Sequence, residues 1–180
     1  QLEADDYSTG GVGGPAVVLL HMVPPGNDRK NYPKDFIDAL LVKQIHVLNL
    51  DRRGAGGSEG TPQDAYQGDK GKLDVKAAIQ FLLQSLCQPD PLRIGGVGAS
   101  NGTTSALDYV VLTESDATQP LPSALVFLTG GAYTENQNKL DDHRDVLDPV
   151  PIQFVYSSAE RDWSVAFQPG YQASASTSQP

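Results

Sequence analysis

The sequence predicts a three-layer α/β sandwich with a mainly parallel sheet of about five strands. Apolar runs of strand length alternate along the chain with longer segments in which apolar residues recur every three or four positions. The runs are also nearly continuous in apolar residues, as in parallel strands that helices cover on both faces. The 180 residues have the length of one domain.

We expect the folded α/β domain to span residues 15–171. Residues 1–14 are polar and rich in glycine, which predicts a flexible arm with room for one edge strand. Residues 172–180 are mainly small and polar, which predicts a disordered tail.

The elements follow from the apolar pattern in chain order. Strands are expected at residues 16–20, 45–50, 92–97, 124–128 and 152–156. Helices are expected at residues 33–43 and 75–86 and in the segment after residue 102, with a weaker helical pattern at 139–146. The polar segment 59–70 and the residues that follow the fifth strand are expected to be loops.

The most informative stretch is Gly98-Ala99-Ser100-Asn101-Gly102, which joins the third strand to a helix and fits G-x-S-x-G. A serine at the tip of a sharp strand-to-helix turn has strained backbone angles, and glycines on either side remove side chains that would collide. Such a turn exposes the Ser100 hydroxyl and directs the Asn101 amide toward a developing oxyanion. The pattern predicts a nucleophile elbow. The alternative is a glycine-rich turn with an incidental serine.

Polar residues follow three of the expected strands, at residues 21–26, 100–101 and 160–162. Because chemistry in parallel sheets collects at the carboxyl ends of the strands, we expect these groups to share one edge of the sheet. Their coincidence there favours a functional site at this edge over an isolated turn.

The chain also contains Asp51-Arg52-Arg53-Gly54-Ala55-Gly56-Gly57-Ser58, which fits D-x-R-G-x-G-x-S directly after the second strand. With this segment, the strand that ends in His21, the Ser100 turn and an acid after the fifth strand, residues 15–168 resemble the α/β-hydrolase family of serine esterases, lipases and dienelactone hydrolases. The resemblance implies a serine hydrolase that acts on a carboxylic ester or a related small-molecule acyl substrate without a cofactor.

Carried over residue by residue, the resemblance implies that Ser100 is the nucleophile and Asp162 the acid of a catalytic triad. The backbone amides of Val23 and Asn101 would form the oxyanion hole. Glu160 competes with Asp162 for the acid role. Asp162 is preferred because it lies further into the expected loop, from where it can reach a base.

The sequence departs from the family pattern in two places. Met22 stands where the family commonly has glycine, and no histidine follows Asp162, although the triad order requires one. Of the three histidines, His21 is expected to be structural and His46 to be packed in or beside a strand. His143, in an acidic and solvated cluster, is an unfavourable candidate for the base.

Three explanations of the missing base remain open. The chain is an incomplete version of the family fold that lacks the C-terminal histidine segment, or it is a catalytically silent binding module, or His143 or another chain supplies the base. The chain begins with Gln1 and carries no signal peptide, which allows either a processed secreted protein or a fragment and leaves the compartment undetermined.

The composition argues against several other functions. The chain has 13 Lys and Arg against 22 Asp and Glu, a formal net charge of −9, and its basic residues are scattered, which disfavours a nucleic-acid partner. No apolar run approaches the ~20 residues of a membrane span. No second His or Cys lies at ligand spacing from His143, so no metal site is predicted. The sequence carries no signature of a particular oligomeric state.

Overall fold

The computed structural model describes residues 1–9, 11–67, 69–131, 133–134, 138 and 142–172, which form a six-stranded sheet in the order β1-β3-β2-β4-β5-β6. Neighbouring strands from β3 to β6 run parallel, whereas β1 is antiparallel to β3. The bounds are β1 (Ala4–Tyr7), β2 (Ala16–Leu20), β3 (His46–Leu50), β4 (Ile94–Ala99), β5 (Leu125–Leu128) and β6 (Ile152–Val155). The predicted mainly parallel sheet is confirmed.

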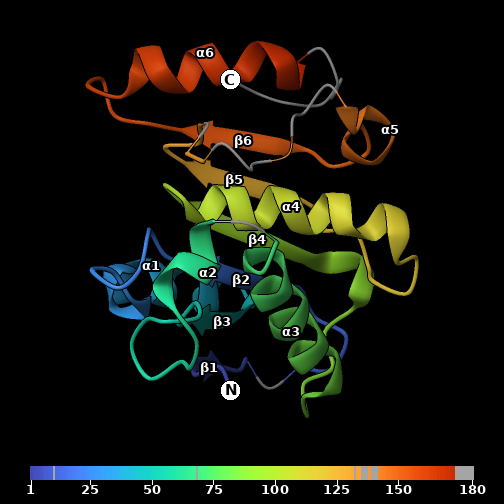
Figure 1. Cartoon of the computed structure of the whole chain (residues 1–180). Helices are drawn as coiled ribbons and strands as arrows, with labels where there is room; N and C mark the ends of the chain where they lie inside the picture. Colours follow the sequence, from blue (N-terminus) through green and yellow to red (C-terminus); the bar gives the residue numbers. More distant parts are fainter. Residues whose placement is uncertain (10, 68, 132, 135–137, 139–141, 173–180) are drawn as a thin grey trace.

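Five α-helices and two 3₁₀ turns lie between these strands in the described part of the chain, and a sixth helix follows β6 (Figure 1). The helices are α1 (Lys34–Val42), α2 (Pro62–Tyr66), α3 (Gly71–Gln84), α4 (Gly102–Ser115), α5 (Arg144–Leu147) and α6 (Arg161–Gln172). The turns are η1 (Arg29–Asn31) and η2 (Pro91–Arg93). None of the helices in these ranges is long and apolar enough to cross a membrane.

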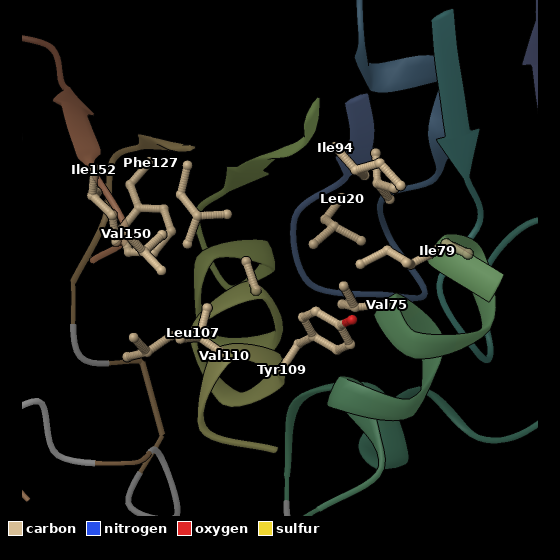
Figure 2. Close-up of a cluster of buried hydrophobic side chains, with 14 of the residues drawn as sticks. Leu20, Val75, Ile79, Ile94, Leu107, Tyr109, Val110, Phe127, Val150 and Ile152 are labelled. Carbon is tan, nitrogen blue, oxygen red and sulfur yellow. The ribbon is translucent and has the colours of Figure 1, made fainter. Parts of the chain in front are cut away.

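Two apolar clusters lie on opposite faces of the sheet. The larger cluster packs α3 and α4 against alternate residues of β2 to β6, and Figure 2 shows part of it around Leu107 and Ile79. The smaller cluster packs α1 against the other face of β2, β3 and β4 through residues such as Ile37. Strands covered on both faces explain why the sequence of β2 is a continuous apolar run, every residue of which is buried.

The strand register brings five polar connections to one edge of the sheet. Leu20 at the end of β2 pairs with Leu50 and Gly98, and Leu128 at the end of β5 pairs with Ala99 and Val155. The segments that follow these strand ends therefore emerge side by side. This edge holds Ser100.

Two loop predictions are wrong. Residues Pro62–Tyr66 of the expected loop 59–70 form α2, which has proline at its first position. After β6, residues 156–160 form the expected loop, but the chain then forms α6 from Arg161 instead of continuing as a loop. The buried side of α6 includes the polar residues Ser164 and Gln168, which are 0% and 3% exposed, so the apolar spacing that signals a helix is missing.

The two ends of the chain differ in what the structure describes. Within residues 1–14, the segment expected to be a flexible arm, Ala4–Tyr7 is the edge strand β1. The expected disordered tail lies, from residue 173 on, outside the described residues, as do residues 139–141 of the weak helical pattern. The end of that pattern coincides with α5.

Candidate active site

Ser100 lies at the turn between β4 and α4 with a positive backbone φ of 50°. Few residues other than glycine adopt this left-handed conformation, and it costs about 1–3 kcal/mol where it occurs. The Ser100 N–H donates to the Leu128 carbonyl at 2.8 Å, and the Ser100 carbonyl accepts from the Thr103 N–H and hydroxyl. The surrounding chain therefore holds the strained angle, with the side chain half-buried.

The glycines on either side of Ser100 are required by close contacts. A Cβ on Gly98 would lie 2.7 Å from the Thr103 nitrogen, and a Cβ on Gly102 would lie 2.3 Å from the Leu20 carbonyl oxygen. The second contact also shows that α4 begins directly against the end of β2. Residues 21–26, which we call the His21 loop, therefore leave the sheet beside the Ser100 turn (residues 98–102).

A buried arginine joins the His21 loop to the Ser100 turn. The Arg52 side chain is 0% exposed and donates five hydrogen bonds, all to neutral acceptors. Burial lowers its pKa to about 10, and the group stays charged at neutral pH. The acceptors are the carbonyl oxygens of His21, Met22 and Ala65 and the side-chain oxygens of Asn101 and Ser105.

The imidazole ring of His21 is buried and neutral at the start of the His21 loop. Its Nδ1 contacts the Met22 carbonyl oxygen at 2.8 Å, and its Nε2 accepts from the Arg52 N–H at 2.9 Å. This pair of contacts requires the proton on Nδ1. Burial and the Arg52 charge lower the His21 pKa to about 4. Both ring nitrogens are therefore occupied away from Ser100.

Asp51 holds the glycine-containing segment that follows it, up to Ser58. Its buried carboxylate accepts from the Arg29 backbone N–H and guanidinium and from the Gly57 N–H, while the Ser58 hydroxyl donates to its carbonyl. A Cβ on Gly56 would overlap the Asp51 carboxylate. The D-x-R-G-x-G-x-S segment therefore folds back on Asp51, and this fixes the orientation of Arg52.

Glu160 is the acid linked to Ser100 through the end of β5, on the side away from the His21 loop. Its carboxylate accepts from the Thr129 hydroxyl at 2.9 Å and from the Ser157 hydroxyl at 2.7 Å. These two hydrogen bonds hold the Glu160 pKa below its usual value, the bond from Ser157 most strongly. Thr129 directly follows Leu128, the residue that accepts from the Ser100 N–H.

Asp162 and His143 point elsewhere. Asp162 lies in the first turn of α6 with a fully exposed side chain, 3.8 Å from Arg161. His143 contacts Glu114 at 3.0 Å, near the last turn of α4, whereas Ser100 precedes the first turn. A helix of 14 residues is roughly 20 Å long at about 1.5 Å per residue, which separates His143 from Ser100.

The two residues expected to supply oxyanion-hole amides lie at the start of α4 and in the His21 loop. Asn101 is the N-cap of α4, where helices leave N–H groups without intrahelical acceptors. Val23 lies in the His21 loop, and its carbonyl accepts from the Asn27 side chain at 2.8 Å. In the described ranges, no group of three or more His, Cys, Asp or Glu side chains is placed to hold a metal ion.

Tyr133 is a residue of this edge that sequence reasoning missed. Its hydroxyl donates to the Thr129 carbonyl, and its ring meets the Trp163 indole edge-on at 4.6 Å. It also interacts with the Ser100 side chain and with the Glu160 charge. Tyr133 lies in a polar stretch before the weak helical pattern at 139–146, so no signal in the sequence identifies it.

Comparison with known proteins gives structural relatives only. No protein-family model and no curated protein matches the sequence. The Pyrococcus furiosus esterase Pf2001 is similar with a TM-score of 0.62 and 17% identity, over 99% of this chain and 81% of that one. The alpha/beta hydrolase GrgF from Penicillium sp. sh18 is similar with a TM-score of 0.55 and 18% identity, over 71% of this chain and 40% of that one.

The chain has the α/β-hydrolase fold. A third relative, DcsB in complex with its substrate analogue, matches with a TM-score of 0.59 and 20% identity, over 81% of this chain. The chain spans 45% of DcsB and 40% of GrgF, less than half the length of each. At these identities the likeness concerns the α/β-hydrolase fold itself, and the predicted fold class is confirmed.

The buried neutral His21 predicts a pH dependence of stability. In the unfolded chain His21 has a pKa of about 6.5, whereas in the folded chain its pKa is about 4. The contribution of the neutral ring to stability is therefore present well above pH 6.5 and is lost as the pH falls toward 4. Between pH 7.5 and 5 this difference removes about 2 kcal/mol from the free energy of unfolding. Urea denaturation at the two pH values measures it.

The matched comparison uses two histidine variants. His21→Gln should lose less stability than the wild type over this pH range, because it has no imidazole to protonate. His143→Gln, which changes a more exposed ring, should behave as the wild type does. An equal loss in the wild type and His21→Gln would contradict the structural role given to His21.

Proposed function

We propose that the chain is a serine hydrolase that cleaves carboxylic esters through an acyl-enzyme on Ser100. The observation that carries this proposal is the left-handed φ of 50° at Ser100, between two glycines that close contacts require, at the strand-end edge of the sheet. An ordinary strand-to-helix turn does not need this strain, whereas a nucleophile elbow does. The fold shared with the esterase Pf2001 also supports the proposal.

In the proposed reaction, the Ser100 Oγ attacks the ester carbonyl carbon while its proton passes to a water molecule, since the three histidines are engaged elsewhere. The backbone N–H groups of Val23 and Asn101 donate to the oxyanion that develops on the carbonyl oxygen. Departure of the protonated alcohol leaves the acyl group on Ser100. Water then releases the carboxylic acid and restores the serine.

We assign the acid role of the proposed triad to Glu160 rather than Asp162. Glu160 is bonded to Thr129 at the end of β5 and interacts with Tyr133, which in turn contacts Ser100. Asp162 extends into solvent from the first turn of α6. The helix that begins at Arg161 turns Asp162 away from the direction it would take in an extended loop.

A second candidate function is a catalytically silent module that binds a ligand at this edge. The observation that favours it is the engagement of all three histidines, which are His21, His46 with Asp6, and His143 with Glu114. A serine hydroxyl without an adjacent base is a poor nucleophile at neutral pH. The two candidates therefore differ in whether Ser100 reacts at all.

A Ser100-dependent ester hydrolysis is the expected result. The folded chain should hydrolyse p-nitrophenyl butyrate faster than buffer, and Ser100→Ala should lower that rate. An oxyanion hole and binding alone provide about 10³–10⁴ over water without the serine. Because no histidine lies at Ser100, we expect the wild type to exceed this level by a small factor and Ser100→Ala to fall to it. Initial rates on both proteins measure it.

Ser115→Ala is the control, since it removes an exposed hydroxyl from the other end of α4 and should keep the wild-type rate. Far-UV circular dichroism establishes that each variant is folded. Equal rates for the wild type and Ser100→Ala would reject the hydrolase and leave the binding module.

A further inference from the structure

The Tyr133 side chain interacts with the Ser100 side chain and with Thr129, the residue that also binds Glu160. The Tyr133 hydroxyl contacts the Thr129 carbonyl, and the Thr129 hydroxyl donates to Glu160. The residue before Thr129, Leu128, accepts from the Ser100 N–H. Tyr133 therefore contacts the proposed nucleophile and shares Thr129 with the proposed acid, and its ring packs edge-on against Trp163.

The contact between Tyr133 and Ser100 leaves the Ser100 hydroxyl without a base. The Tyr133 proton is used on the Thr129 carbonyl, so the phenol oxygen meets the Ser100 hydroxyl as an acceptor. Burial and the Glu160 charge raise the Tyr133 pKa, which keeps the phenol neutral. A neutral phenol cannot take the Ser100 proton. A hydrogen bond made to Ser100 before attack and lost during attack slows the reaction.

We propose that Tyr133 is a positioning residue that fills the place between Ser100 and Glu160 from which a proton acceptor must act, and so slows the reaction of Ser100 in this arrangement. The inference rests on the proposed hydrolase function. It adds that Tyr133 closes the side of Ser100 that faces Glu160.

Removal of the Tyr133 ring should open a space bounded by Ser100, Glu160 and Trp163. An imidazole molecule has the size and the two opposed nitrogens to use this space. One nitrogen would accept the Ser100 proton while the other donates to the Glu160 carboxylate. The proposal therefore predicts that added imidazole activates Ser100 only when the ring is gone.

The experiment measures Ser100 labelling by a fluorophosphonate probe, followed by intact-mass spectrometry, with and without imidazole at pH 8. Imidazole should accelerate Ser100 labelling of Tyr133→Ala at least about tenfold. It should leave the wild type and Tyr133→Phe unchanged, because both keep the ring in place. Tyr7→Ala, the same substitution at the opposite edge of the sheet, should also show no response.

Two further comparisons separate this role from a general loosening of the fold. In the Tyr133→Ala background, Glu160→Gln should abolish the imidazole response and Asp162→Asn should preserve it. If Tyr133→Ala does not fold, Trp163→Ala removes the brace instead. That indole is 46% exposed, and its loss should give a smaller response in the same direction.

The outcomes distinguish the two proposals. Ser100-dependent labelling that imidazole does not selectively accelerate in Tyr133→Ala, or accelerates equally in Tyr133→Phe, would overturn the role of Tyr133 alone. Absence of Ser100-dependent labelling from every folded variant, with and without imidazole, would overturn the hydrolase proposal and this inference with it.

Discussion

The arrangement around Ser100 depends on one buried cation. Removing a guanidinium from water costs several kcal/mol, and Arg52 offsets this cost through five hydrogen bonds to neutral oxygens. Those oxygens belong to three segments that are distant in sequence, namely the His21 loop, α2 and the first turns of α4. If these segments separated, the charge would lose its acceptors while still buried, so Arg52 favours the one arrangement in which they meet.

The two sides of Ser100 are therefore built differently. On one side, Arg52 and the neutral His21 hold the His21 loop against the start of α4, the two segments of the proposed oxyanion site. On the other side, Glu160 and Tyr133 meet at Thr129, the first residue after β5. In our proposal the first side carries the oxyanion that forms during acyl transfer, and the second is occupied by a phenol that cannot accept a proton.

The parts of the molecule that the sequence predicts are those with local or periodic causes. Buried parallel strands require continuous apolar runs, and the Ser100 turn requires glycines at 98 and 102. Both features can therefore be predicted from the sequence. The α6 helix is missed because Ser164 and Gln168 occupy its buried face as polar residues. The first turn of α6 directs Asp162 into solvent, which is why we assign the acid role to Glu160. Tyr133 lies in a polar stretch that carries no sequence signal. Tertiary contacts alone place both.

A double-mutant cycle on Arg52 and Asn101 tests the central constraint most directly. Arg52→Met, Asn101→Ala and the double variant are compared with the wild type by the free energy of unfolding in urea. Because both side chains share one buried hydrogen bond at 2.9 Å, the double variant should be at least about 1 kcal/mol more stable than the sum of the single losses implies. Single losses that add to within about 0.5 kcal/mol would contradict the coupling of the His21 loop to the Ser100 turn through Arg52.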